Sequence, residues 1–169
     1  MGQSLVSELK VSLKHTYTNA LDDRNVVDAP VLAFTDAMAD GTGSGKAQHA
    51  FYDDRSLTTT ASEELDLTAI AAAFGDVVFS KIKQILIEVT TATSGYRLEV
   101  GGAAANAWTE FVKDASDIVM AYAGGCTVLY NSPVNGGTVD GTHKMLKIYN
   151  PSGGTVAYKI WIVGEGALA

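Results

Sequence analysis

The C-terminal third of the chain carries the pattern that most constrains its fold. Residues 144–150 read KMLKIYN, residues 151–154 read PSGG, and residues 155–164 read TVAYKIWIVG. Two apolar runs separated by a few turn-forming residues are typical of antiparallel strands joined in a hairpin. We therefore expect residues 144–150 and 155–164 to pair with each other.

The second of these runs is apolar on both of its faces. Because successive side chains of a strand point to opposite sides, the run divides into two sets. One set is Val156, Tyr158, Ile160 and Ile162, and the other is Ala157, Lys159, Trp161 and Val163. Such a strand is either central in a two-layer stack or covered by a partner subunit.

Strand periodicity extends over much of the remaining chain. Residues 8–18 alternate between apolar and polar side chains, which predicts a half-buried strand near the N-terminus. After a turn-rich link that begins with NALDDRN, a short second strand is predicted at residues 31–35. Further strands, several of them bounded by glycine pairs, are predicted at residues 82–90, 96–100, 118–122 and 127–130.

The strongest helical pattern is the short run TAIAAAF at residues 68–74, which Gly75 would end. Glu63 and Glu64 suit the N-terminal side of such a helix, and Ser62 is the candidate cap. The predicted fold is therefore all-β, an antiparallel β-sandwich (jelly-roll-like) or a barrel, with one short helix. The length of 169 residues fits one domain. We expect a single β-sandwich domain over residues 1–169, whose N-terminal strand, about residues 5–18, is a candidate for contact with neighbouring subunits.

Composition narrows the classes of partner. Charged residues make up 18% of the chain, against the roughly 25% that is usual in soluble domains, which suggests that part of the surface meets another protein. A formal net charge of -7 disfavours binding to nucleic acid or to an anionic membrane. No apolar run approaches the length of about 20 residues that a membrane-spanning helix needs. The first residues, MGQSLVSELKVSLKH, lack the apolar core of a secretory signal.

The stretch ADGTGSGKAQHAFYDDR, residues 39–55, resembles a phosphate-binding loop only superficially. A P-loop would need glycine where Asp40 stands and serine or threonine where Ala47 stands. A dinucleotide-binding motif would need a third glycine at Lys46. We expect no bound nucleotide here, and interpret residues 41–46 as a mobile or partner-contacting loop.

No other group of residues predicts catalysis, a cofactor or a metal centre. His49, Asp53 and Asp54 are close in sequence, but no second pair at ligand spacing accompanies them. The only cysteine, Cys126, follows two glycines at the start of an apolar run, where an inert buried thiol is the usual state. One cysteine allows no disulfide within the chain and no cysteine cluster for zinc, which is consistent with a reducing interior.

Several phrases occur in an order that resembles a known group of proteins. They are ELKVSLKHTYTNALD, DLTAIAAAFGDVVFSKIKQILIEV, VGGAAANAW and LKIYNPSGGTVAYKIWIVGEG. Together they resemble small β-rich virion proteins of tailed bacteriophages and prophages. The resemblance covers most of the chain, is weakest between residues 19 and 52, and departs most around residues 120–134. It rests on packing and turn residues, so it assigns no functional residue.

The resemblance implies a structural role in an assembled particle. A capsid decoration protein of the cement or head-fibre type is the first expectation, localised to the virion after assembly in the host bacterial cytoplasm. A tail component or receptor-binding module is the second, and a polysaccharide-directed enzyme the third. The implied partners are further copies of this chain and the major capsid protein, with no nucleic acid, membrane or cofactor.

Four apolar residues are candidates for the contact between subunits. Trp161 and Val163 lie on the second face of the C-terminal strand and would leave an apolar patch on a lone monomer. Trp108 and Phe111 are interpreted as core or interface anchors, or else as a platform for a carbohydrate. We expect a closed homo-oligomer, with a trimer preferred to a dimer.

Overall fold

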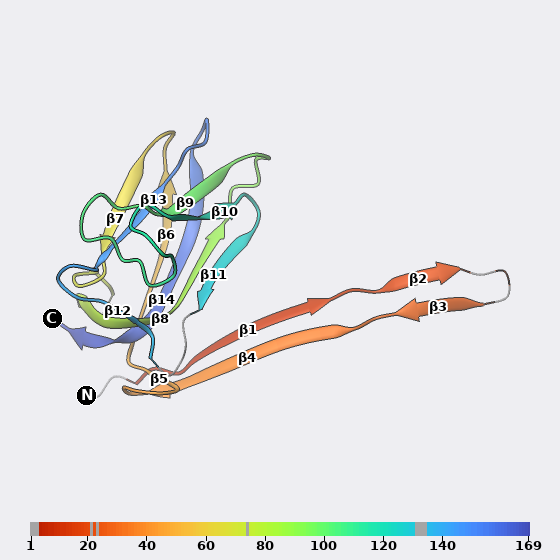
Figure 1. The fold of residues 1–169 in the computed structure, drawn as a ribbon, viewed down its shortest axis with the longest axis horizontal. Coiled ribbons are helices and arrows are strands. Elements are labelled where there is room, and N and C mark those ends of the chain that lie inside the picture. The colour runs from red at the N-terminus through yellow and green to blue at the C-terminus, as the bar shows by residue number, and fades with distance from the viewer. Residues whose placement is uncertain (1–3, 21, 23, 74, 131–134) are drawn as a thin grey trace.

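A two-layer β body with one long projecting arm makes up the computed structural model, which describes residues 4–20, 22, 24–73, 75–130 and 135–169 (Figure 1). The arm holds β1 (Ser7–Lys14), β2 (Tyr17–Ala20), β3 (Asn25–Asp28) and β4 (Val31–Asp40), with β5 (Lys46–Ala47) at its base. The body holds β6 (His49–Leu57), β7 (Ser62–Asp66), β8 (Val77–Val89), β9 (Arg97–Gly101), β10 (Ile118–Tyr122), β11 (Cys126–Tyr130), β12 (Gly137–Thr138), β13 (Met145–Tyr149) and β14 (Val156–Leu168).

The body consists of two antiparallel sheets packed face to face. One has the strand order β10-β9-β13-β7, and the other has the order β11-β8-β14-β6, with β12 beside β8. Buried side chains from both sheets form a single core, which includes Leu98 and Ile148 from the first sheet and Ile87 and Ile160 from the second. The prediction of an all-β, sandwich-like fold is confirmed. In the described part of the chain neither sheet closes on itself, so a barrel is not confirmed.

The strand pairings of the body are nested. β6 pairs with β14, β7 with β13, β8 with β11, and β9 with β10. The first body strand therefore pairs with the last, the second with the one before it, and so on inward. Two further pairings, β14 with β8 and β13 with β9, join these pairs into the two sheets.

The C-terminal strand β14 is central in its sheet, as its two apolar faces predict. It pairs with β6 on one side and with β8 on the other. Its inner face, formed by Val156, Tyr158, Ile160 and Ile162, is at most 1% exposed. Burial of an aliphatic side chain of this size contributes roughly 1.5–3 kcal/mol, so this face is a large share of the core's stability. The outer face takes part in a surface described below.

The predicted hairpin between residues 144–150 and 155–164 is wrong. Both strands form, as β13 and β14, but they belong to different sheets. Asn150 explains the change of sheet: its side chain is fully buried, and its Nδ2 donates to the carbonyls of Leu57, Thr58 and Gly154. The turn is thereby tied to the end of β6 in the opposite layer, so the chain crosses the sandwich instead of folding back within one sheet.

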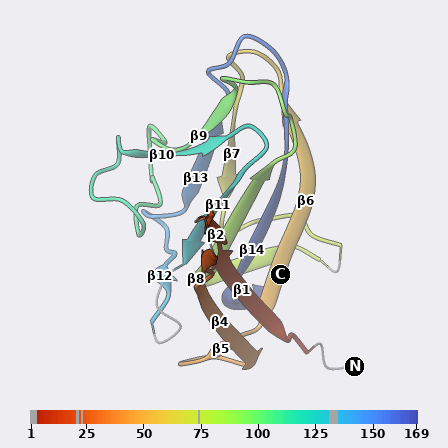
Figure 2. The ribbon, with the colours of Figure 1, turned by 90° about the vertical axis from the view of Figure 1, so that its right-hand side faces the viewer.

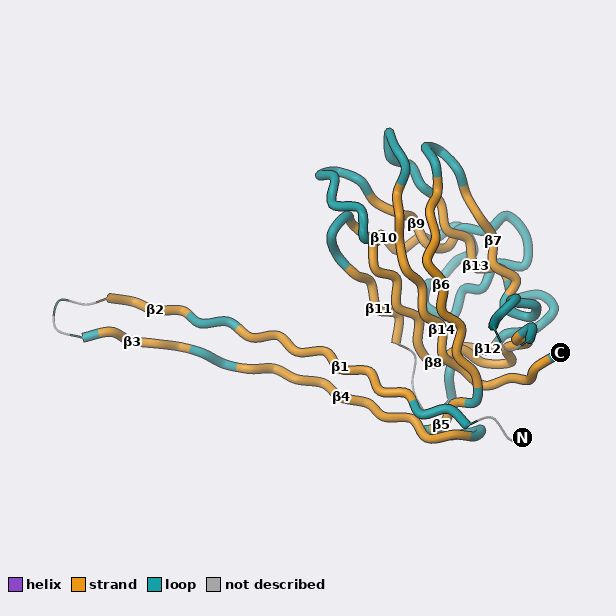
Figure 3. Tube along the Cα trace, turned by 180° about the vertical axis from the view of Figure 1, so that it is seen from behind, coloured by secondary structure: helices purple, strands orange, loops and turns teal. Residues whose placement is uncertain are grey.

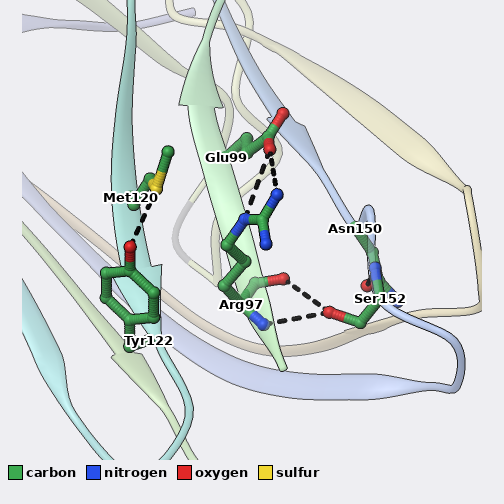
Figure 4. A network of polar contacts seen from close by, with 6 residues as sticks. All are labelled: Arg97, Glu99, Met120, Tyr122, Asn150 and Ser152. Atoms are coloured by element: carbon green, nitrogen blue, oxygen red, sulfur yellow. Dashed lines mark hydrogen bonds and ion pairs between the residues drawn. The ribbon is translucent and has the colours of Figure 1, made fainter. Parts of the chain in front are cut away.

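Ser152 extends the same turn to the strand β9. Its backbone N–H donates to Asn150 Oδ1, and its hydroxyl bonds to both the N–H and the carbonyl of Arg97 (Figure 4). On the outside of β9, the Arg97 guanidinium binds Glu99 at 3.1 Å. The PSGG segment therefore joins β6, β9 and β14 at one end of the body, through side chains that a turn propensity does not reveal.

No helix forms at residues 68–73, and Phe74 lies outside the described residues, so the predicted short helix is wrong. Figure 3 shows only strands and loops in the described chain. The backbone N–H of Leu67 donates to Lys144 O and that of Ile70 to Val77 O, while Leu67 and Ile70 are buried in the core. Tertiary partners replace the hydrogen bonds of a helix, because a run this short gains little from helix formation. Ser62, Glu63 and Glu64, expected before the helix, lie in β7.

The N-terminal strand forms, but it is not half-buried. β1 pairs with β4 alone, and most of β1 and all of β2 and β3 are exposed. β4 is also longer than the predicted strand at residues 31–35, because it continues to Asp40. The alternation of residues 8–18 thus belongs to a ribbon that no second layer of this chain covers.

We predict that Asn150→Ala destabilises the protein by about 2–4 kcal/mol, because it leaves several buried carbonyls without a donor. Urea denaturation followed by tryptophan fluorescence measures the change. Asn25→Ala, at an exposed arm position, is the control and should leave the denaturation midpoint unchanged. An unchanged midpoint in Asn150→Ala would show that the sheet-crossing turn does not depend on this side chain.

Candidate interaction surface

The arm is the most exposed apolar element of the molecule. Nine of the fourteen exposed large apolar side chains of the described residues lie in it, a set formed by Val6, Val11, Leu13, Tyr17, Val26, Val27, Val31, Leu32 and Phe34. The arm leaves the bottom of the body and extends away from both sheets (Figure 1), and Figure 2 is the view along the arm. Apolar surface on this scale usually marks an interaction site.

The base of the arm packs on the body through a small apolar cluster. Met38 of β4, Ala47 of β5 and Val163 of β14 are buried together, with Leu5 against them. Beside this cluster, the Phe34 ring meets the Tyr130 ring edge-on at 5.3 Å between centroids. Burial raises the pKa of Tyr130 to about 12, and its hydrogen bond to Asp36 adds to the rise. Only the first part of the arm is therefore supported by its own chain.

A buried ion pair fixes the glycine loop that follows the arm. Lys83 Nζ lies 2.9 Å from Glu165 Oε1, and their side chains are 0% and 7% exposed. Glu165 accepts the Gly43 N–H at 3.0 Å, and Lys83 donates to the Gly43 carbonyl at 3.2 Å. Both backbone groups of Gly43 are thus bound by the body. The interpretation of residues 41–46 as a mobile or partner-contacting loop stays a prediction, and these bonds show that the middle of the loop is held by the body.

Glycine is needed in this loop because the chain reverses within a few residues. Gly41, Gly43 and Gly45 have φ angles of 120°, 94° and 66°, a region that side chains with a Cβ disfavour. The loop carries the chain back beside β4, where β5 pairs in parallel with the end of that strand. Lys46 is exposed and lies outside the ion pair. The loop's glycines thus have a structural reason that requires no bound phosphate.

The outer face of the β11-β8-β14-β6 sheet is a second apolar surface. Cross-strand register places Tyr52, Trp161, Leu86 and Val128 in one row across its four strands. The Tyr52 and Trp161 rings are 4.5 Å apart between centroids, and Tyr52 is 49% exposed. The next row is charged and ends in a thiol, with Asp54, Lys159, Glu88 and Cys126. The expectation of a buried thiol is wrong, because Cys126 is exposed at the edge strand β11.

A groove of about 710 Å³ runs between this face and the arm base. Ser7, Glu8 and Leu9 of the arm form one side of the groove, while Leu86, Cys126 and Trp161 are among the residues of the sheet side. The groove is open, and no other layer of the described chain lies over the apolar row.

The four predicted interface residues fall in two different places. Trp161 is half-buried in the groove, whereas Val163 is covered by the arm base of its own chain. Trp108 is 2% exposed and its indole N–H donates to the Thr138 carbonyl at 2.8 Å, so it anchors β12 to the core. Phe111 packs against Trp108, with 5.3 Å between ring centroids. Trp161 and Phe111 are both partly exposed, and of the two only Trp161 lines the groove of about 710 Å³.

The acidic residues near His49 do not converge. Because Asp53 and Asp54 are neighbours on a strand, they point to opposite faces of the sheet. Asp53 lies 3.0 Å from Arg55, whereas Asp54 accepts the Tyr52 hydroxyl at 2.6 Å. Among the described residues there is no group of three or more His, Cys, Asp or Glu side chains that could hold a metal ion. Nor does that part of the chain contain a helix long and apolar enough to cross a membrane.

No family model and no curated protein matches the chain. The arm and the groove, two surfaces with unsatisfied apolar area, are the features on which a functional assignment has to rest. Sequence periodicity identified Trp161 but not its row, because Tyr52, Leu86 and Val128 are brought beside it only by strand order. The arm was signalled by the alternation at residues 8–18.

We predict that Lys83→Met destabilises the protein by about 3–5 kcal/mol, because it leaves the Glu165 carboxylate buried without its partner. Thermal or urea unfolding at neutral pH measures the loss. Lys10→Met, which removes the exposed pair with Glu8, is the matched control and should change stability little. Equal stability of the two variants would mean that the buried pair does not hold the arm base.

Acid should weaken the same contact in the wild type. Burial by itself raises the pKa of Glu165. The hydrogen bonds from Lys83 and the Gly43 N–H lower the pKa by more than burial raises it, so that the resulting pKa lies below its usual 4.5. A lowered native pKa gives stability that is present above about pH 4.5 and is lost as the pH falls through the native value. Comparison of wild type and Glu165→Gln across pH 2–7 should show a smaller acid-dependent loss in the variant.

Proposed function

We propose that this chain is a non-enzymatic structural protein of a tailed-phage virion, and specifically a capsid decoration protein of the cement or head-fibre type. It acts as a homo-oligomer, with a trimer preferred, bound to the major capsid protein. Its localisation is the virion, after assembly in the host bacterial cytoplasm. The observation that carries the proposal is the arm, an element that has no evident use in a lone monomer.

The physics of the arm supports an assembled state. A single two-stranded ribbon is at best marginally stable in water, because it buries little apolar surface. In this arm Leu13 and Leu32 are 66% and 73% exposed, although they face each other across the ribbon. A protein that keeps such a ribbon gains most of its stabilisation from a neighbour. Structural proteins of particles have neighbours at fixed positions.

The body supports the same reading through its connectivity. The nested pairings of β6 with β14, β7 with β13, β8 with β11 and β9 with β10 follow the pattern of one long hairpin rolled into two sheets. We therefore propose an eight-stranded jelly roll for the body, an architecture used by viral capsid and lectin domains, and the nested order of pairings supports this proposal. A fold hosts many functions, so this argument is an analogy that adds to the arm.

The other two functional classes have less support. Exposure of Trp108 in a shallow cleft would favour a receptor-binding or tail module, whereas Trp108 is 2% exposed. A polysaccharide hydrolase needs two carboxyl groups across the scissile bond. The adjacent pair Asp53 and Asp54 points to opposite faces, and Glu63 is occupied by Tyr158 and Arg55.

Imaging of particles tests the location. Negative-stain images of virions labelled with an antibody against this chain should show label over the head. Label confined to the tail would support the tail component instead, and particles without label would remove the virion assignment.

We predict that the wild-type chain is oligomeric at tens of micromolar and that Trp161→Glu shifts it toward monomer, because a carboxylate in the apolar row must be desolvated on assembly. Light scattering coupled to size exclusion measures the mass. Ser56→Glu adds the same charge at an exposed position of β6 and serves as control, with the oligomer expected to persist. A monomeric wild type would contradict the self-association.

A further inference from the structure

We propose that the groove on the outer face of the β11-β8-β14-β6 sheet receives the arm of a second copy of this chain. The inference rests on the self-association in the proposed function and deepens it, because it names both contacting segments. Each chain then donates one arm and accepts another, so the contact is between two different surfaces. Contacts of that kind close into a ring when the rotation between subunits permits.

The groove has the chemistry to hold an apolar strand. On its sheet side the groove is lined by Leu86, Val128 and Trp161, and the same row continues beyond the groove to Tyr52 on β6. The outer face of the opposite sheet also exposes apolar side chains, Ile118, Met120 and Tyr122, but these lie on the edge strand β10 beside the Arg97–Glu99 ion pair. The row on the β11-β8-β14-β6 sheet crosses four strands and borders a groove, so a strand laid on it removes a continuous apolar surface from water.

The arm has the complementary chemistry on one of its two faces. Register pairs Leu9 with Asp36, Val11 with Phe34 and Leu13 with Leu32, so these side chains share one face. The opposite face carries Lys10 with Thr35, Ser12 with Ala33 and Lys14 with Val31. The ribbon is therefore amphipathic. Laid on the sheet with its leucine face inward, it keeps Lys10 and Lys14 in water.

The area of the contact depends on the part of the arm beyond its base. A strand rises about 3.3 Å per residue, so the ribbon from Val11 to Ala20 is roughly 33 Å long and about 10 Å wide. Burying one face of it against a neighbour removes on the order of 700 Å² in total, which is small for a single specific interface. In a closed ring every chain makes two of these contacts, and together they exceed the lower limit of about 1,000 Å².

The occupant is a second copy, not the chain's own arm. The Lys83–Glu165 pair binds Gly43 at the end of the arm, and Val163 packs under Met38, so the arm base is fixed where it meets the body. From there the arm extends away from the sheets (Figures 1 and 3). Its own base is one wall of the groove. An incoming arm therefore lies beside the outgoing one.

The single native thiol gives a direct test. Cys126 is exposed and lies at the end of the charged row, where it lines the groove. A cysteine placed on the leucine face of the arm, by Leu13→Cys or Leu32→Cys, should be joined to Cys126 of another chain by a short bis-maleimide. The matched controls are Ser12→Cys and Ala33→Cys, which are neighbours in the same two strands but lie on the opposite face of the ribbon.

The expected result is covalent dimers and higher closed species on denaturing gels for Leu13→Cys and Leu32→Cys. Much less is expected for the two controls, and none when Cys126→Ser is added. Two results would overturn the inference. Equal cross-linking on both ribbon faces means that no defined face contacts the groove, and cross-linking within single chains means that the arm folds back on its own body.

The outcome separates the two proposals. An oligomer that Trp161→Glu dissociates but that gives no cross-link from either leucine position removes the arm from the contact and leaves the virion role intact. A chain that is monomeric and uncross-linked, yet labels phage heads in images, means that the arm binds the major capsid protein and not a second copy. Cross-linked rings without head labelling keep the arm contact and remove the decoration role.

Discussion

The position of β14 between β6 and β8 is the constraint on which the other parts of the structure depend. One face of this strand supplies the centre of the core, and the other lies under the arm base and the open groove. At Gly164 and Gly166 a Cβ would collide with the carbonyls of Lys81 and Val78, so only glycine lets β8 and β14 approach there. The register shifts on either side of Glu165 turn its carboxylate to Lys83.

The direction of the arm follows from that local irregularity. A carboxylate buried at the shifted register requires a cation, and Lys83 and the N–H of Gly43 together stabilise it. Through Gly43 the loop after β4 is bound to the body, and through Met38 and Val163 the end of β4 is packed on it. The distal ribbon has no comparable support. Its orientation is therefore set at one end only, which leaves the exposed leucines available to a neighbour.

The sequence was sufficient for the fold class and for most strand positions, because alternation and glycine punctuation are local signals. It predicted β10 at residues 118–122 and the two-faced strand β14 correctly. The predictions from sequence failed where a residue distant in the sequence determines the local structure. Asn150 looks like an ordinary turn residue, yet its bonds to Leu57 and Thr58 send the chain to the other sheet. Helix propensity at residues 68–73 is overridden by the pairing of Ile70 with Val77.

The candidate surface shows the same division between local and distant information. Trp161 could be selected from its strand alone, but the row that makes it part of a surface depends on strand order, as does the burial of Val163 under the arm. The alternation of residues 8–18 was interpreted as a strand half-buried in its own domain. Alternation reports only that one face of a strand avoids water, and it does not say whose surface covers that face. In a chain that leaves such a face exposed, the pattern is evidence for the neighbour that its own fold lacks.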